Sequence, residues 1–538
     1  MSDDGITRLM GPDDVTTDLE EEDVSANPFD EAEEKVVIQP EVWWKVLLEV
    51  VGMRFFVMMF ITQFLLRGMC MTIMAGVALP LFENILQIEA GRMQTMMTIV
   101  YLAWSAKPII GVLSDVLVFR GGSKKKPWLW MGSGCGIVGS AFLFLAFVNN
   151  SAVGICVCMM LIQTQIAVFD LMMESRWSAL MNRHPQQTGT YLVVIASILQ
   201  DAGCVIAASF VGPMMDGVAR TMYYPLFAII TAITCVPLYF VYHNWIGEEQ
   251  NQSSSSFVTL ELPHLRSERV ILAVVFATGF AAIFTVFLTN AVDSAIGLAV
   301  ALVIVAWILS ANYVIFPPMM FRVALFQVIV MLSRPSIGRA LDFFYTASPE
   351  CLPDGPHFPF WFYMTLATII GTLASLLGGF IYQYFLTRIR IRTELIGTQI
   401  MAGTFACGDL MLATHANRAI GLPDKVSYVC GEAIAERLIA TLNNMPARTL
   451  LSKVVPHGLE SSCYAFQAGI GNFAMMISEM SGALIFEAAG VRTYPPSQCN
   501  FAPLWWLILV CHVSLPIVGG VLAAYFLIPN ILPSEKLE

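Results

Sequence analysis

Charged side chains recur inside long apolar stretches of this sequence, where they could bind or carry a charged solute. Three arginines stand near the middle of such stretches: Arg67, Arg334 and Arg437. A guanidinium group can hold a carboxylate through two parallel hydrogen bonds, so these arginines are candidates for binding an anion. An ionisable group at bilayer depth is costly unless it is paired or hydrated, which makes each of them a functional candidate.

A second set of candidates consists of acids in similar surroundings, which could carry a proton because a buried carboxyl group is readily kept neutral. They are Asp170, Glu174, Asp201, Asp409 and Glu436. Asp170 and Glu174 share one helical stripe with Gln163. For any single residue, a salt bridge that clamps two helices together is an equal alternative. For the whole set, we favour a water-filled solute path.

The elements that must position these side chains are expected to be membrane-spanning helices. Hydrophobic residues make up 57% of the 538 residues, charged residues only 13%, and the mean hydropathy is +0.69, which excludes a soluble protein. Apolar runs of about twenty residues are long enough to cross ~30 Å of hydrocarbon, and a helix satisfies its backbone groups within one segment. Fourteen helices are predicted, over 55–81, 93–115, 128–148, 152–178, 189–213, 223–243, 269–290, 293–316, 322–345, 359–386, 394–416, 426–448, 460–487 and 503–528.

The order of these segments predicts an all-α polytopic membrane protein with two six-helix halves. The halves cover 45–246 and 317–530, with an inserted two-helix hairpin at 269–316 between them. A cytosolic linker is expected at 247–268 and a cytosolic tail at 531–538. Residues 1–44 are expected to form a disordered cytosolic tail, because fourteen acids and two bases within 1–41 give that stretch a charge of −12.

Basic residues predict the orientation of the helices, because Lys and Arg accumulate in cytosolic loops. Lys124 to Lys126, and Arg388, Arg390 and Arg392, fall in loops on one side, which places both termini in the cytosol. No transit signal is present, so the plasma membrane is the expected location. Two loops on the opposite, oxidising side carry Cys351 and Cys499, which are either disulfide-bonded or two free thiols.

Lys107, Gly111 and Asp115 stand where the second predicted helix meets its basic loop. Gly111 allows close approach of a neighbouring backbone. Asp115 could pair with the basic loop or cap a facing helix. We therefore expect this element to be a gating latch at the cytoplasmic end, and we do not expect Asp115 to bind the solute.

Four stretches together are similar to a known family: Lys107-Pro108-x-x-Gly111-x-x-Ser114-Asp115; Asp170-x-x-x-Glu174 followed by Gln200-Asp201-x-Gly203; Phe343 to Thr346 before Cys351 to Phe358; and Val455 to Glu460 running on to Gly471-Asn472. The chain resembles the folate–biopterin transporter family of the major facilitator superfamily over roughly 45–528. Its fourteen-helix layout looks most like trypanosomatid members. Val455 stands where the family often has Cys, and Val118-Phe119 where it often has Pro-Ile.

The resemblance implies a secondary transporter that takes up folate, biopterin or related pterins by alternating access, together with protons. Some members move S-adenosylmethionine, so that substrate, or another nucleoside-like solute, is the first alternative. A transport-dead receptor or scaffold that signals through its acidic tail is the second. No Walker element, Gly-x-Ser-x-Gly motif, His cluster or metal spacing is present, so we expect no enzyme activity, cofactor, metal or nucleic-acid partner.

Overall fold

The structure, a computed structural model, describes residues 51–119, 123–183, 191–217, 219–247, 258–260, 269–452 and 460–532. The predicted tail at 1–44, most of the predicted linker at 247–268 and of the predicted tail at 531–538, and residues 455–459 of the family motif lie outside these residues.

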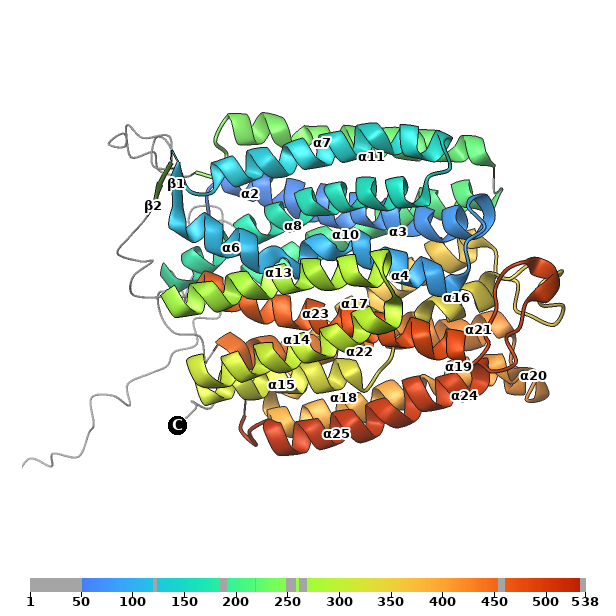
Figure 1. Ribbon diagram of the computed structural model, residues 1–538. Helices are drawn as coiled ribbons and strands as arrows, with labels where there is room; N and C mark the ends of the chain where they lie inside the picture. The colour runs from blue at the N-terminus through green and yellow to red at the C-terminus, as the bar shows by residue number, and fades with distance from the viewer. Residues whose placement is uncertain are drawn as a thin grey trace, which may run out of the picture. The chain divides into compact units, whose positions relative to one another are not determined.

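The first part of the chain forms six passages through a helical bundle (Figure 1). Two of them are composite, because π-helical or non-helical turns interrupt the α-helix. The elements are α2 (Met53–Phe60), η1 (Ile61–Cys70), α3 (Met71–Pro80) and η2 (Leu81–Ile85); α4 (Ala90–Val100), α5 (Leu102–Ser105) and α6 (Lys107–Val116); α7 (Lys126–Val148); α8 (Ala152–Arg183); α10 (Tyr191–Asp216); and η3 (Arg220–Met222) with α11 (Tyr223–Tyr242).

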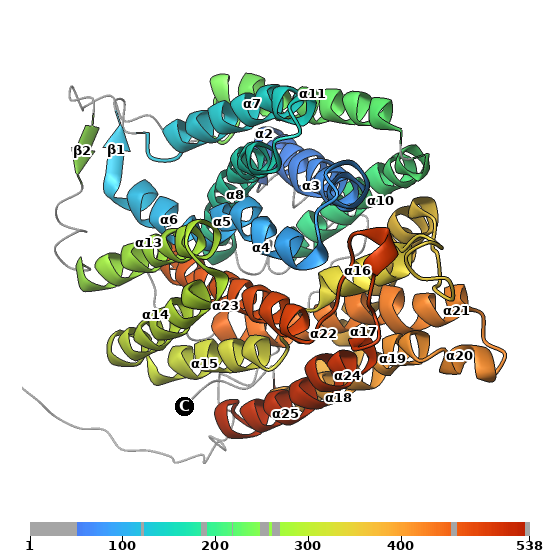
Figure 2. The same ribbon diagram turned by 45° about the vertical axis from the view of Figure 1, so that its right-hand side comes forward.

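A helical hairpin follows, made of α13 (Arg269–Ala291) and α14 (Ser294–Ile315). Its tight turn is stabilised by Asp293, whose carboxylate caps α14 by accepting hydrogen bonds from the backbone N–H groups of Ala295 and Ile296, at 2.8 and 3.1 Å. Helix α13 packs against α6 and α14 packs against α23 (Figure 2). An apolar cluster that includes Phe466 and Phe473 lies where the hairpin meets α15 and α23.

The last part of the chain forms six further passages. The elements are α15 (Pro318–Leu332) and α16 (Gly338–Thr346); η4 (Trp361–Leu366), α17 (Ala367–Tyr384) and η5 (Leu386–Arg388); α18 (Ile391–Phe405), α19 (Cys407–Ala413) and α20 (Ala416–Ala419); α21 (Asp424–Tyr428), η6 (Val429–Ala433) and α22 (Ile434–Ser452); α23 (Glu460–Ala488) and η7 (Pro496–Gln498); and α24 (Leu504–Leu507), η8 (Ile508–Ser514) and α25 (Leu515–Leu527).

Every one of the fourteen predicted segments coincides with helix, which confirms an all-α polytopic membrane protein. Among the described residues, eleven helices are long and apolar enough to cross a membrane. The other three predicted segments, 93–115, 322–345 and 426–448, are also helical but are interrupted or carry charge. Interrupted helices are tolerated at membrane depth where neighbouring helices satisfy the freed backbone groups.

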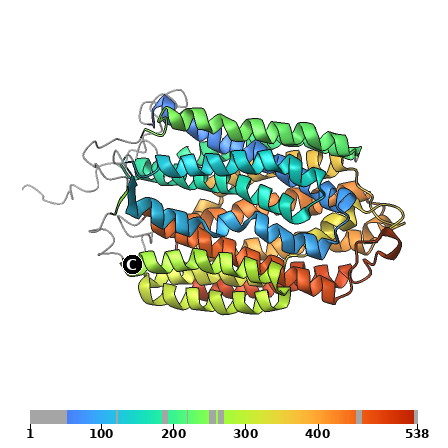
Figure 3. The ribbon, with the colours of Figure 1, turned by 45° about the horizontal axis from the view of Figure 1, so that its top comes forward.

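The two ends of the bundle differ, and we name them by what they carry. The strand end holds the two-stranded antiparallel sheet of β1 (Leu117–Phe119) and β2 (Val258–Leu260), with Leu117 opposite Leu260. The start of α2 and the end of α25 lie at this end as well (Figure 3). The disulfide end holds the bond between Cys351 and Cys499.

Candidate functional site

Asp170 of α8 lies between two cations contributed by other helices. Its Oδ1 accepts a hydrogen bond from Arg67 of η1 at 2.7 Å, and its Oδ2 accepts one from Lys107 of α6 at 2.5 Å. Gln63, one turn before Arg67, donates to Oδ1 at 3.3 Å. Asp170 and Lys107 are almost fully buried, whereas the Arg67 side chain is 22% exposed. Three hydrogen-bond donors offset the free-energy cost of burying the Asp170 carboxylate. Of the two cations, Arg67 is still in contact with solvent.

Trp104 of α5 joins this cluster to the rest of the predicted stripe on α8. Its indole N–H donates to Gln163 at 2.9 Å, and the ring lies 4.3 Å from the Lys107 ammonium and 5.6 Å from the Arg67 guanidinium. Glu174 is 3.9 Å from Lys107 and 42% exposed. Gln163, Asp170 and Glu174 therefore face the same polar interior.

Lys107 lies in this interior cluster, paired with Asp170, whereas the sequence motif groups it with Asp115 at the cytoplasmic end. The reason is the break between α5 and α6, which starts α6 at Lys107 and lets the side chain reach α8. Gly111 lies one turn further along, with its carbonyl accepting from Ser114 at 2.8 Å, and Asp115 stands directly before β1. Asp115 therefore lies at the strand end, and its part in gating stays a prediction.

Two glycines pack the part of α10 that carries Asp201 against the part of η1 that carries Arg67. Helix α10 crosses η1 at the point where Gly203 meets Gly68. A Cβ added to Gly68 would lie 2.6 Å from the Gln200 carbonyl oxygen and 2.8 Å from the Gly203 Cα, so the two backbones approach as closely as glycine allows. This contact gives a reason for a glycine two residues after Asp201: Gly203 lets α10 pack closely against η1, which brings Asp201 to the interface between the two helices.

Asp201 also faces Arg437, which comes from the other half of the sequence. The two side chains are within electrostatic reach of each other from α10 and α22. Cys204, one turn further along α10, is within electrostatic reach of Asp201, Arg437 and Arg67. Arg437 and its neighbour Glu436 are exposed, although they stand well inside a membrane-length passage. Charged side chains from both halves thus share one accessible region.

Arg334 does not lie mid-helix as the sequence predicted, but in a break between α15 and α16. Pro335 explains the break, because proline lacks an N–H group and disfavours helical geometry in the residue before it. Ser478 of α23 satisfies the broken backbone by donating to the Arg334 carbonyl at 2.5 Å and by accepting from the Ser336 N–H at 3.0 Å. The break leaves the Arg334 side chain within reach of Asp409 and Glu432.

Asp409 of α19 is 1% exposed and lies among groups from several helices. Its Oδ1 accepts a hydrogen bond from the Tyr345 hydroxyl of α16 at 2.5 Å. The carboxyl group of Glu432, on η6, is within electrostatic reach of it, as is that of Glu436 one turn further along. Asp409, Arg334 and Glu436 are therefore brought together in the second half of the chain, separate from the Asp170 cluster.

A third group of interior charges was missed by the sequence reasoning. Arg339 bonds to Asp342 at 2.7 Å, and the Tyr363 hydroxyl also donates to Asp342. Thr346 donates to Glu83 of η2 at 3.2 Å. The i,i+3 spacing of Arg339 and Asp342 within an apolar segment was the signal that could have revealed this pair.

Hydrogen bonds tie the two halves together near the disulfide end. The side-chain amide of Gln94 on α4 donates to the carbonyls of Ser336 and Glu479, both at 2.6 Å. The backbone N–H of Ala90 donates to Thr493 at 2.9 Å. With the Thr346–Glu83 bond, these contacts form a seam that would have to separate if this end were to open.

The disulfide joins the loop after α16 to the loop after α23, with Cα atoms 5.3 Å apart and a sequence separation of 148. At the same end, Arg418 pairs with Asp424 at 2.6 Å, and this hydrogen bond lowers the pKa of Asp424. That pair is partly exposed, so its contribution to stability is small.

Replacing Cys499 by serine is expected to lower the unfolding temperature and to make it independent of reductant. Opening a loop of 148 residues costs about 2–4 kcal/mol, because the unfolded chain regains conformational freedom. Thermal unfolding of the purified protein with and without reductant measures the effect. Cys235→Ser, at an exposed free cysteine, is the control and should melt like the parent protein. Equal melting of both variants would contradict a structural role for the bond.

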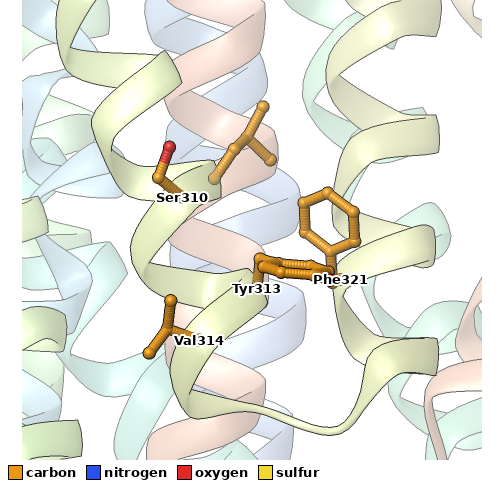
Figure 4. A pocket seen from close by; sticks show the side chains of 5 residues that line it. Ser310, Tyr313, Val314 and Phe321 are labelled. Atoms are coloured by element: carbon orange, nitrogen blue, oxygen red, sulfur yellow. The ribbon is translucent and has the colours of Figure 1, made fainter.

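The groove drawn in Figure 4 is not part of this site. It has a volume of about 300 Å³ and lies between α14 and α15, lined by Leu309, Ser310, Tyr313, Val314 and Phe321. Tyr313 and Val314 are 65% and 80% exposed, so the groove opens away from the bundle. None of the candidate charged residues lines it.

One known protein family matches most of the chain. The sequence pattern of the BT1 family matches residues 67–536. The chain belongs to the BT1 family. This confirms the resemblance found in the sequence.

Several curated BT1-like proteins are similar to the chain at low identity. Probable folate-biopterin transporter 6 of Arabidopsis thaliana is 20% identical over 93% of this chain and 89% of its own length. Folate-biopterin transporter of Synechocystis sp. (strain ATCC 27184 / PCC 6803 / Kazusa) is 21% identical over 77% of this chain and 72% of its own length. Folate transporter 1 of Plasmodium falciparum (isolate 3D7) is 24% identical over 39% of this chain; the chain spans only 38% of that relative's length.

Solved structures of transporters share the fold of this BT1 member. An auto-inhibited POT family peptide transporter aligns with a TM-score of 0.60 at 13% identity, over 88% of this chain and 97% of that one. The nucleoside transporter NupG aligns with a TM-score of 0.52 at 13% identity, over 88% and 98%. At these identities the likeness concerns the fold alone, which is that of the major facilitator superfamily.

Proposed function

We propose that this protein is a secondary active transporter that moves folate, biopterin or related pterins by alternating access, coupled to protons. The observation that carries the proposal is the region shared by Arg67, Asp201 and Arg437, where charges from both halves of the chain face one another and remain accessible. A structural clamp would gain nothing from leaving charges accessible at membrane depth. The similarity to folate-biopterin transporters of Arabidopsis thaliana and Synechocystis supports the choice of substrate.

The chemistry of the region suits a flat, anionic solute. Arginine binds carboxylates through paired hydrogen bonds, so Arg67 and Arg437 could hold the acidic end of a folate. The Trp104 ring, which lies beside Arg67 and Lys107, offers an aromatic face on which a flat ring could stack. Segments 45–246 and 317–530 would be the two halves that rock against each other, with the seam at the disulfide end closed in this structure.

The orientation follows from charge and redox chemistry. The strand end would face the cytosol, because Lys124 to Lys126 and Arg388 to Arg392 lie in its loops. The disulfide would then lie on the oxidising side, which agrees with a plasma membrane location and cytosolic termini.

Uptake of labelled folate or biopterin into cells that express the chain is expected to be saturable, and Arg437→Ala is expected to lower it. Losing a hydrogen bond to a charged group costs about 1.5–3 kcal/mol, which is roughly a 10- to 100-fold loss of affinity. Arg220→Ala, at the disulfide end, is the control. Competition with S-adenosylmethionine tests the alternative substrate, and deletion of residues 1–40 tests the receptor alternative. No uptake of either pteridine above background would refute the substrate.

A further inference from the structure

Two carboxyl groups in the second half of the chain are held together by an unusually close packing of their helices. Asp409 and Glu432 each follow a glycine, Gly408 on α19 and Gly431 on η6. A Cβ added to Gly408 would lie 2.8 Å from the Gly431 Cα, so the two backbones are in direct contact. The next residue on each element is the acid, and the close approach forces the two carboxyl groups together.

This contact is between two hydrogen-bond acceptors unless a proton is present. The Oδ1 of Asp409 is occupied by the Tyr345 hydroxyl, and its Oδ2 is buried and accepts no hydrogen bond from the described residues. The carboxyl of Glu432 is its neighbour across the Gly408–Gly431 contact and is within electrostatic reach. An ionised carboxylate only accepts, so a bond between the two groups requires that one of them be protonated. Like charges this close cannot both be ionised cheaply, as in the paired aspartates of acid proteases.

The groups around the pair do not supply enough positive charge to hold two anions. The elements packed against it contribute Glu436 from α22, Tyr428 from α21, Tyr345 from α16, His512 from η8 and Arg334 from the break before α16. Arg334 is the cation within electrostatic reach of both carboxyls, and it also faces His512. Among the groups named here, Asp409 and Glu432 therefore share one guanidinium.

An aromatic layer separates the pair from the disulfide end. Phe358, from the loop after α16, is 3% exposed and its ring lies 5.9 Å from that of Tyr345 and 5.2 Å from that of Tyr428. Phe362 lies 5.0 Å from Phe358. These rings form apolar surroundings on one side of the pair, and such surroundings strengthen the repulsion between two ionised carboxyls.

We propose that Asp409 and Glu432 form the proton-binding site that couples transport to a pH gradient. The pair holds one proton in the closed-seam state described here. Release of that proton leaves two carboxylates in contact, and their repulsion drives η6 away from α19. Because η6 continues into α22, this movement displaces Arg437, which lies one turn beyond Glu432 in the solute region. The inference rests on the proposed function and names the site of its proton.

The test uses purified protein in liposomes with the membrane potential held at zero. With one proton per solute, a gradient of about one pH unit supports roughly tenfold accumulation of folate or biopterin. Asp409→Asn and Glu432→Gln, made separately, each remove the shared proton while keeping a hydrogen-bonding side chain. Each is expected to abolish accumulation, while exchange of labelled for unlabelled solute continues. Asp354→Asn, on an exposed loop, is the matched control and should accumulate like the parent.

The outcomes separate the two proposals. No exchange of either pteridine by the parent protein would refute the proposed function. Exchange by the parent, with accumulation equal in the parent and both variants, would refute the proton site alone. Loss of exchange in a variant that melts like the parent would place the pair in the solute path and would also overturn the inference.

A variant that fails to fold does not end the test. Gly408→Ala keeps both carboxyls but separates them, and it should reduce accumulation more than exchange. In the parent protein, a change in proton binding on addition of folate to an unbuffered solution should be detected with a pH indicator. A parent that binds folate with no proton uptake or release would overturn the inference.

Discussion

Replacing Asp170 by alanine is expected to remove most of the folded protein from the membrane, and with it all uptake. Arg67 and Lys107 both bond to this carboxylate, and Lys107 is 4% exposed, so the change leaves a buried cation with only the more distant Glu174. Removing one partner of a buried ion pair costs about 3–5 kcal/mol. That is a large share of the roughly 5–15 kcal/mol that stabilises a typical folded protein. Quantitation of the protein in membranes, with Asp354→Asn as the control, measures the loss.

A double substitution separates the structural role of this cluster from its role in transport. Lys107→Met with Asp170→Asn removes one positive and one negative charge together, so Arg67 is left with a neutral hydrogen-bonding partner. Because no charge is left buried alone, the amount of folded protein should recover. Uptake should not recover if the cluster belongs to the solute path. Recovery of both would show that the cluster only clamps the helices.

Gly203→Ala is expected to lower the unfolding temperature of the purified protein. The added Cβ would lie 2.9 Å from the Gly68 Cα and would overlap the Phe64 carbonyl oxygen, and neither backbone can move without opening the contact between α10 and η1. Overpacking of this kind costs about 1–3 kcal/mol. Because the contact positions Asp201, uptake per folded molecule should fall as well.

Gly379→Ala is the matched control for this prediction. Gly379 is also a helical glycine, but a Cβ added there would meet no atom within 4 Å. Alanine favours a helix over glycine by about 1 kcal/mol, so this variant should be as stable as the parent or slightly more stable. Equal destabilisation of the two variants would contradict the close packing of Gly203 against Gly68.

The positions of the helices could be predicted because each passage needs about twenty apolar residues, and this pattern is visible in one sequence. Helix interruptions were harder to place. Pro335 marks the break that holds Arg334, yet Pro446 lies inside α22 without ending it. A proline shows that a hydrogen bond is missing, but the neighbouring helices decide whether the chain bends, breaks or continues.

The individual site residues could be predicted more fully than their partners. Each of Arg67, Asp170, Asp201 and Arg437 stands out as a charge in an apolar segment. That Asp170 pairs with Lys107, or that Asp201 faces Arg437, depends on contacts between segments far apart in the sequence. The Asp409–Glu432 pair likewise requires the contact of Gly408 with Gly431, which no spacing along one helix reveals.

The most direct test of a shared solute path is the reactivity of a cysteine at Arg437. The background carries serine at the exposed cysteines Cys235 and Cys430, and at Cys204 in the solute region. In Arg437→Cys, a small water-soluble thiol reagent should react, and saturating folate or biopterin should slow the reaction. In Leu377→Cys, at an exposed apolar position of α17, the same reagent should not react, because that side chain faces lipid. A cysteine at 437 that is unreactive, or that reacts at the same rate with and without pteridine, would contradict the account.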